Sequence, residues 1–384
     1  MTRTKKKICF IVAVPMTASA FLLKHFEVLS ADFDVYLVAN FEGVNSNLKD
    51  NPHLKEIFSV GIQRDIHMLK DFGALKDLTR YFRKMDFDAV LTVTPKAGFL
   101  GILAAYRAGI RSRIHIFTGQ VWHTKSGLFK QILMAIDRLT FRLATEVLVD
   151  GKAQQQFLID LNIITNERSR VLGKGSISGV DSNRFVSEDL VRKHWRKELG
   201  YDDSDVVFMF LGRLNVDKGI LDLARAFQQL IGTCPNARLL LVGYDEENLI
   251  PEVTKIIGDP SRFHFFGPTS KPNELLQASD VFCLPSYREG FGTSIIEASL
   301  LEKPILCSDT YGLKETIIEN VTGLRHKTAD SDSIFTQMIV LVSDPEMRKR
   351  MGKEGRRYVL ENFTALAISA SWSEYFKSIL LKNS

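Results

Sequence analysis

The 384-residue chain contains few cysteines and no long apolar stretch. No pair of cysteines has the spacing of a metal site or of a disulfide framework, and this usage fits a reducing cytoplasm. No segment reaches the roughly 20 consecutive apolar residues that a membrane-spanning helix needs. The sequence therefore argues against small disulfide-rich secreted proteins and integral helical membrane proteins. The four cysteines are Cys9, Cys234, Cys283 and Cys307.

Glycine is missing from residues 14–19, which follow the first apolar segment. A Rossmann dehydrogenase needs Gly-x-Gly-x-x-Gly at this place, so this enzyme class is disfavoured. The N-terminus also imitates a signal peptide, with basic residues before the apolar residues 8–14 and a small-residue motif at 18–20. Because Pro15 ends that apolar run early, we interpret it as the first strand of a Rossmann domain.

Charge is distributed unevenly along the chain, whose net charge is +5. Residues 1–180 contain 25 Lys and Arg against 16 Asp and Glu, a net charge of +9. Residues 181–384 contain 25 against 29, a net charge of −4. This asymmetry predicts that the first half meets an anionic partner, either a membrane surface or a phosphorylated acceptor. An ordinary solvated surface without a partner is the alternative.

Strand-like and helical segments alternate over the whole chain, which predicts doubly wound parallel α/β sheets. The length favours two domains, and the glycine- and serine-rich residues 173–181 are the predicted linker. The predicted strands are residues 7–14, 34–39, 89–93, 114–118, 146–149, 170–173, 206–211, 239–242, 263–266, 281–284 and 305–308. The predicted helices are residues 18–29, 69–85, 97–108, 129–143, 153–161, 188–199, 221–231, 247–257, 274–278, 295–301, 345–360 and 364–381.

The most informative stretch is 285–297, between a short apolar strand at 281–284 and a helix at 295–301. Two glycines allow a sharp turn before the helix, whose unpaired N–H groups and dipole favour an anion. Glu289 and Glu297 flank this phosphate-sized site. A capping box is the alternative for the second carboxylate, because its spacing from Ser294 also fits one.

A second loop, residues 212–219, follows the strand at 206–211 and opens a helix. Such strand–loop–helix junctions bind phosphates in open α/β sheets. Arg213 offers a planar fork and Lys218 a point charge for phosphate oxygens, although two solvated loop cations are the alternative. Two cations and a helix N-terminus can replace Mg²⁺, so no metal is expected. The Asp-x-Asp triplets, none of which follows a strand, are interpreted as turn formers.

Three motifs together resemble one family of enzymes. They are the Glu-x7-Glu stretch, the Gly-Arg-Leu-x-x-x-Lys-Gly loop, and Gly-Val-Asp…Arg-Phe at 179–185. The chain resembles retaining glycosyltransferases of family 4 with the GT-B fold, of the capsular-polysaccharide and O-antigen type. The resemblance implies two Rossmann-like domains facing a cleft. They are an acceptor-binding domain at 1–176 and a nucleotide-sugar-binding domain at 177–362, with a helix at 363–384 that packs back on the first.

The resemblance also implies an activity. It is transfer of a hexose or N-acetylhexosamine, with retention, from a UDP-sugar to a lipid-linked oligosaccharide at the inner membrane face. Glu289 would face the donor sugar, Arg213 and Lys218 the diphosphate, and Glu297 the ribose. A non-catalytic sugar-nucleotide-binding subunit is the alternative. No nucleic-acid partner or metal cofactor is implied, and the remaining donor-binding residues would be Gly212, Gly290, Phe291, Gly292, Thr293 and Ser294.

The polar run after the strand at 114–118 is the predicted sugar contact of the first half, because ligands bind at the carboxyl ends of parallel strands. Thr118, Gln120 and His123 are the candidates. Many family members carry a histidine at the place of Thr118. His115, a lone histidine within a strand, is expected to be structural.

Overall fold

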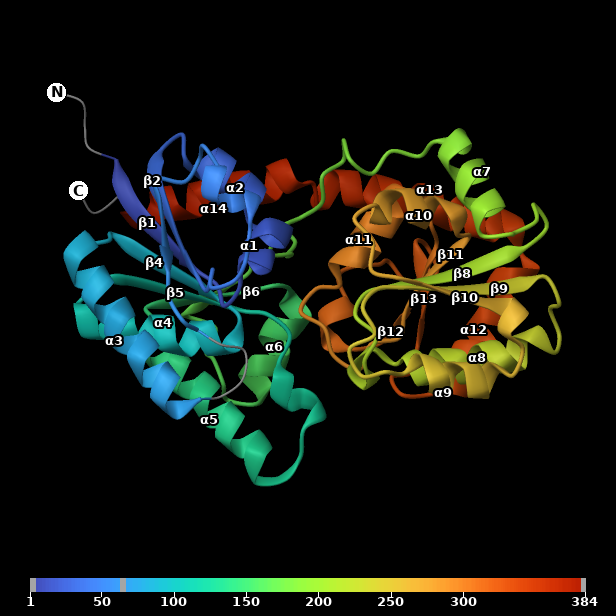
Figure 1. The fold of residues 1–384 in the computed structure, drawn as a ribbon, viewed down its shortest axis with the longest axis horizontal. Coiled ribbons are helices and arrows are strands. Elements are labelled where there is room, and N and C mark those ends of the chain that lie inside the picture. The colour runs from blue at the N-terminus through green and yellow to red at the C-terminus, as the bar shows by residue number, and fades with distance from the viewer. Residues whose placement is uncertain (1–4, 63–66, 381–384) are drawn as a thin grey trace. The chain divides into compact units, whose positions relative to one another are not determined.

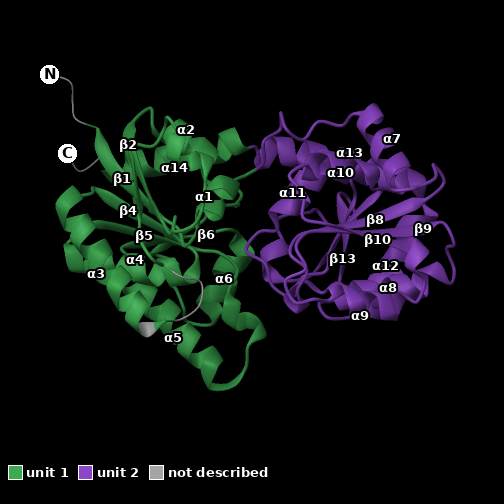
Figure 2. Cartoon of the chain, viewed as in Figure 1, with its two compact units in different colours: residues 1–179, 365–384 green, residues 180–364 purple. Residues whose placement is uncertain are grey.

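The structure is a computed structural model that describes residues 5–62 and 67–380. The chain forms two compact units (Figure 2). Unit 1 contains residues 1–179 and 365–384, and unit 2 contains residues 180–364. Unit 1 is therefore built from both ends of the chain, whereas unit 2 is continuous in sequence.

Unit 1 is organised around a seven-stranded parallel sheet with the strand order β3-β2-β1-β4-β5-β6-β7 (Figure 1). The chain moves outward from β1 in one direction and then from β4 in the other, which is the doubly wound topology. The strands are β1 Lys6–Ile11, β2 Phe33–Ala39, β3 Glu56–Ser59, β4 Ala89–Val93, β5 Ser112–Phe117, β6 Glu146–Val149 and β7 Ser169–Arg170.

Helices cover both faces of this sheet. Alternate residues of β1 face opposite sides, so that Phe10 packs with α2 and α14 while Ile11 packs with α3 and α4. Trp372 of α14 stacks on Phe10 with ring centroids 6.0 Å apart, and Figure 1 shows α14 (red) beside α2. The helices of unit 1 are α1 Pro15–Phe21, α2 Leu23–Leu29, α3 Met68–Met85, α4 Pro95–Ala108, α5 Gly127–Leu143, α6 Lys152–Asp160 and α14 Ala365–Leu380.

Unit 2 repeats this architecture with a six-stranded parallel sheet in the order β10-β9-β8-β11-β12-β13. In Figure 1, α8, α9 and α12 lie on one side of the sheet, and α10, α11 and α13 lie on the other. The strands are β8 Val206–Leu211, β9 Ala237–Val242, β10 Phe263–Gly267, β11 Val281–Leu284, β12 Ile305–Ser308 and β13 Gly323–His326. The helices are α7 Asp189–Glu198, α8 Ile220–Ile231, α9 Ile250–Ile257, α10 Pro272–Ala278, α11 Thr293–Leu300, α12 Ser331–Ser343 and α13 Pro345–Asn362.

The predicted fold class, two doubly wound parallel α/β sheets, is confirmed. The helix predicted over 18–29 is wrong, because the structure has two helices there, α1 and α2, with Leu22 between them. Strands β3 and β13 and helix α12 were not predicted. Among residues 5–62 and 67–380, no helix combines the length and apolar character required to cross a bilayer.

Candidate functional site

The two predicted phosphate loops lie next to each other in unit 2 because β8 and β11 are neighbouring strands. Each loop follows the carboxyl end of its strand. The backbone N–H of Tyr287 donates to the carbonyl of Asp217 at 2.8 Å. The Arg288 guanidinium forms an ion pair with the Asp217 carboxylate, also at 2.8 Å. Backbone and side-chain contacts therefore join the two motifs into one site.

Lys218 and Glu289 form an ion pair between these loops. The Ser286 hydroxyl donates to the same carboxylate oxygen of Glu289 at 2.8 Å. The two side chains of the pair are only 20% and 13% exposed, so the interpretation of Lys218 as a solvated loop cation is wrong. The arrangement holds an ammonium and a carboxylate together beside the start of α11, where both can exchange partners with a ligand.

Glycine is required where these loops approach each other most closely. Gly219 has a φ of +70°, and a Cβ there would lie 2.2 Å from the carbonyl oxygen of Pro285. A Cβ on Gly312 would lie 2.1 Å from the carbonyl oxygen of Glu289. Backbone thus packs directly on backbone around Glu289, which fixes its position before any ligand arrives.

Arg213 forms a salt bridge with Glu246, a residue that the sequence analysis did not single out. One guanidinium nitrogen lies 2.7 and 2.8 Å from the two carboxylate oxygens. The amide of Asn215 donates to the same carboxylate at 2.7 Å. The Arg213 side chain is 49% exposed, so its remaining donors can reach a phosphate.

The acidic run after β9 supplies both this partner and a helix cap. Helix α9 begins at Ile250, three residues later than predicted, because both oxygens of Asp245 accept backbone N–H bonds from Leu249 and Ile250. An acidic residue in the loop after a central strand is the sequence signal that could have identified Glu246. The pairing of Glu246 with Arg213 could not be inferred from the sequence, because helix propensity alone extended the predicted helix of this region back to residue 247.

Helix α11 begins without a side-chain cap. Gly292 is the N-cap residue, with a φ of +68°, and Ser294 lies inside the helix. The capping-box interpretation of Ser294 and Glu297 is therefore wrong. Glu297 is half-buried, and burial raises the pKa of its carboxyl to about 7, while the positive charge of Arg184 opposes that shift. Glu297 is thus available to accept hydrogen bonds from a ligand.

Glu297→Gln should stabilise the unliganded protein at pH 8 and weaken UDP binding. Because the folded-state pKa lies above the ordinary value of 4.5, the wild type loses stability as pH rises from about 4.5 to 7. Removing the charge should raise the melting temperature at pH 8 by about 2–8 °C, and hardly at pH 4.5. Thermal unfolding with and without UDP measures both effects. A variant that is less stable at pH 8, or that binds UDP normally, would contradict this assignment.

The predicted sugar contacts of the first half lie in unit 1, directly after β5. Gln120 is only 3% exposed, and its amide donates to the Thr118 carbonyl at 2.6 Å. Gln154 of α6 donates to the same carbonyl at 2.9 Å and to the Gln120 side chain at 3.3 Å. The His123 ring packs edge-on against Phe157, with centroids 5.2 Å apart. The loop is therefore held by an amide network that the sequence analysis missed.

His115 occupies a structural position. A nitrogen of its ring lies 2.8 Å from the Thr92 hydroxyl, and burial lowers the pKa of the ring to about 3. A Cβ on Gly98 of α4 would lie 2.3 Å from the ring, so the glycine makes room for the histidine. His115 therefore links β4, β5 and α4 as a neutral ring.

The Asp-x-Asp triplets have structural roles. Asp88 accepts the backbone N–H of Lys7 at 2.8 Å, next to β1. Asp330 caps α12 by accepting the N–H of Ser333, also at 2.8 Å. Both contacts are structural, a long-range tie for Asp88 and a helix cap for Asp330, and neither is the turn that was predicted.

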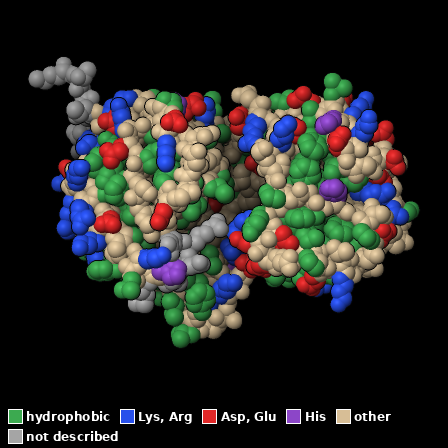
Figure 3. Space-filling model, in the orientation of Figure 1, with side chains coloured by type: hydrophobic (Ala, Val, Ile, Leu, Met, Phe, Trp, Pro, Cys, Tyr) green, Lys and Arg blue, Asp and Glu red, His purple; other side chains and the backbone are tan. Residues whose placement is uncertain are grey.

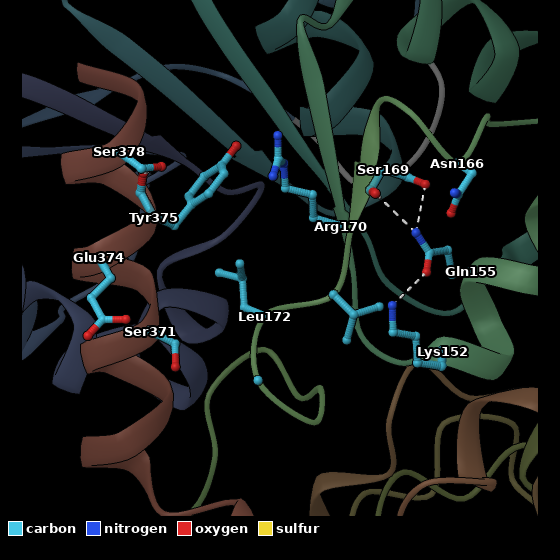
Figure 4. Close-up of a pocket in the computed structure, with 12 residues that line it drawn as sticks. Lys152, Gln155, Asn166, Ser169, Arg170, Leu172, Ser371, Glu374, Tyr375 and Ser378 are labelled. Atoms are coloured by element: carbon cyan, nitrogen blue, oxygen red, sulfur yellow. Dashed lines mark hydrogen bonds between the residues drawn. The ribbon is translucent and has the colours of Figure 1, made fainter. Parts of the chain in front are cut away.

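A pocket of about 510 Å³ in unit 1 is lined by α6, β7 and α14 (Figure 4). Figure 4 shows Gln155 between Lys152 and Ser169, with Tyr375 and Ser378 across the pocket. None of the predicted site residues lines it.

Two Rossmann-like units, one of which holds the two predicted phosphate loops side by side, are the architecture of the GT-B class of glycosyltransferases. The description "Glycosyl transferase 4-like domain" matches residues 52–175, and "Glycosyl transferases group 1" matches residues 191–358. The first half of the chain therefore matches a family 4-like glycosyltransferase domain and the second half a group 1 glycosyltransferase domain, and the chain has the GT-B fold.

Several characterised proteins are similar over nearly their whole length. The capsular polysaccharide biosynthesis glycosyltransferase CapM of Staphylococcus aureus is 27% identical over 89% of this chain and 88% of its own. The UDP-Gal:alpha-D-GlcNAc-diphosphoundecaprenol alpha-1,3-galactosyltransferase of Escherichia coli is 26% identical over 94% of each chain. Anabaena HepE, solved with UDP and glucose, has the same fold, with a TM-score of 0.80, 20% identity and coverage of 97% and 100%.

Proposed function

We propose that the protein is a retaining glycosyltransferase that moves a hexose or N-acetylhexosamine from a UDP-sugar to a lipid-linked oligosaccharide in cell-surface polysaccharide biosynthesis. The observation that carries this proposal is the Lys218–Glu289 pair beside the start of α11. The activity of the Escherichia coli relative, with a UDP-sugar donor and a diphosphoundecaprenol acceptor, supports the donor and acceptor classes. The UDP complex of HepE supports a nucleotide-sugar site.

The side chains of unit 2 would divide the work between binding and charge stabilisation. Arg213 and Lys218 hold the diphosphate and stabilise the charge that develops on it, together with the N–H groups at the start of α11. Glu289 positions the donor sugar, and ionised Glu297 accepts ribose hydroxyl hydrogen bonds. The N–H groups belong to the donor-binding residues Gly290, Phe291, Gly292, Thr293 and Ser294, and Gly212 lets the first loop approach.

The proposed transfer occurs on one face of the sugar. The bond from the anomeric carbon to the phosphate oxygen breaks as the bond to the acceptor oxygen forms. The proton of the acceptor hydroxyl passes to the leaving phosphate, so configuration is retained without a protein base. Because Arg213 and Lys218 neutralise the phosphate charge, we propose that the reaction needs no metal.

A screen of nucleotide sugars for UDP release tests the function, with membrane lipid extract as the acceptor and EDTA in a parallel series. We expect release with a UDP-sugar only when extract is present, and equal rates with and without EDTA. Loss of activity in EDTA that Mg²⁺ or Mn²⁺ restores would overturn the metal-independent chemistry alone. Binding of UDP without any glycosylated lipid product would favour the non-catalytic subunit, whose expected mark, loss of Glu289 or Lys218, is absent from the sequence.

We further propose that unit 1 associates reversibly with anionic membranes at the cytoplasmic face. Helix α5, the candidate membrane-contacting helix, carries exposed apolar side chains, among them Leu128 at 77% and Ile132 at 48% exposure. Figure 3 shows hydrophobic side chains near the start of α5 and Lys and Arg side chains over α3. A pocket of about 430 Å³ lies between α3 and α4 and is lined by Phe72, Thr79 and four cations. The cations are Lys76, Arg80, Arg83 and Arg107. The basic residues on or beside α5 are Lys125, Lys130, Arg138 and Arg142.

This surface predicts salt-dependent binding to acidic liposomes. Each cation near an anionic surface contributes about 1 kcal/mol, so the pair Lys76→Gln with Arg83→Gln should weaken binding at least tenfold. Co-sedimentation with phosphatidylglycerol and phosphatidylcholine vesicles at two salt concentrations measures it. The exposed pair Lys349→Gln with Arg350→Gln, on α13 of unit 2, removes the same charge as a control. Equal pelleting with neutral and acidic vesicles would contradict the electrostatic mechanism.

A further inference from the structure

Asp150 is a buried aspartate of unit 1. It directly follows β6 and is only 4% exposed. Its backbone is fully used, because its N–H donates to the Gln154 side chain at 2.9 Å and its carbonyl accepts from the Ser176 N–H at 2.7 Å. Within residues 5–62 and 67–380, no hydrogen bond or ion pair reaches its carboxylate.

This burial destabilises the unliganded protein. Withdrawal from water raises the pKa of the Asp150 carboxyl to about 7, and no neighbouring charge opposes the shift. Buried carboxylates normally have several donors, since an unpaired charged group is costly in a protein interior. The described residues supply no such donor, so the carboxylate is left for solvent or a ligand to satisfy.

The surroundings of Asp150 are rigid and face the ligand edge of the sheet. The side chain of Gln154, in the first turn of α6, bonds the loop after β5, and that of the next residue, Gln155, donates to Ser169 at 3.0 and 2.9 Å (Figure 4). Helix α6 is thus held on both sides. Because β5 and β6 are paired, Asp150 follows the strand next to the one that precedes Gln120. Carboxyl ends of neighbouring strands form the ligand-binding edge of open α/β sheets.

We propose that Asp150 accepts a hydrogen bond from a hydroxyl group of the acceptor sugar. A sugar hydroxyl donates the hydrogen bond that an ionised carboxylate needs, and the amides around it suit a neutral, hydroxyl-rich ligand. This inference rests on the proposed function and adds an acceptor-binding residue in unit 1. The donor site in unit 2 is independent of it.

Asp150→Asn tests the inference without knowledge of the natural acceptor. Saturation-transfer NMR with the methyl glycosides of glucose and N-acetylglucosamine reports sugar binding. We expect a signal with the wild type that falls at least fivefold in Asp150→Asn. UDP affinity should stay unchanged, and the melting temperature at pH 8 should rise. The control is Asp160→Asn, an exposed aspartate at the end of the same helix, which should match the wild type.

Sugar transfer to lipid extract gives a second, independent measurement. The apparent KM for the extract should rise at least tenfold in Asp150→Asn, with a smaller change in kcat. If the wild type releases no UDP with lipid extract, the proposed transfer is refuted. The NMR comparison of the wild type with Asp150→Asn still decides the role of Asp150. Equal NMR signals for both proteins, no signal with the wild type, or a Ca²⁺-induced melting shift abolished by the variant would overturn the hydroxyl assignment.

Discussion

Lys218→Ala should reduce sugar transfer by about a hundredfold and weaken UDP binding, while unit 2 stays folded. In the proposed reaction the ammonium is a charge-assisted partner for the leaving diphosphate, and loss of one such contact costs about 2–4 kcal/mol in the transition state. The substitution also leaves the Glu289 carboxylate with only the Ser286 hydroxyl as a partner among the described residues, so the carboxylate proposed to position the sugar loses its orientation. UDP titration and steady-state rates of UDP release measure the two effects separately.

A matched control is Lys255→Ala, which removes an exposed lysine from α9 of the same unit. It should leave binding and transfer unchanged. Because Lys218 and Glu289 are paired, the double variant Lys218→Ala with Glu289→Gln should lose much less than the product of the two single effects. Normal kinetics in both Lys218→Ala and Arg213→Ala would refute the diphosphate site.

Gly243→Ala should prevent unit 2 from folding stably. Gly243 directly follows β9, has a φ of +140°, and would place a Cβ only 1.7 Å from the carbonyl oxygen of Gly212. Neither residue can shift independently, because both backbones are held by hydrogen bonds. The Gly212 N–H donates to the Val242 carbonyl at 3.0 Å, and the Gly243 N–H donates to the Gly267 carbonyl at 2.9 Å. We expect a loss of about 4 kcal/mol or more, which exceeds the cost of most single substitutions.

Gly258→Ala separates backbone conformation from crowding. Gly258 ends α9 with a φ of +73°, and a Cβ there would meet nothing within 4 Å. This substitution should cost only about 1 kcal/mol. Circular dichroism and thermal unfolding compare the two variants. A Gly243→Ala protein as stable as Gly258→Ala would show that the loops after β8 and β9 are not packed as closely as described.

The sequence predicted the central strands best. Strands β8, β11 and β12 match their predicted bounds because each is a short apolar run, buried throughout or nearly so. The missed strands are both at sheet edges. Strand β3 has exposed ends, and β13 contains glycine, arginine and histidine, so neither has the pattern of a buried strand. Helix α12 was missed because its apolar and β-branched residues show little helical periodicity.

The candidate site was predicted as residue types, and the structure supplied their partners. The spacing of glycines and charges marked Lys218 and Glu289, but their ion pair depends on β8 and β11 being neighbours. Glu246 reaches Arg213 because β9 lies on the other side of β8. Asp150 carries no local signal, since the burial of a single aspartate arises from tertiary packing alone.

The return of the last helix to unit 1 has a consequence for synthesis on the ribosome. All residues of unit 2 have been made once residue 364 is added, whereas unit 1 still lacks α14. Trp372 and Phe376 belong to the core around Phe10 and Phe26, so nascent unit 1 exposes that apolar surface until α14 has been made. Unit 2 can therefore complete its folding before unit 1, whose core stays open until α14 has been made.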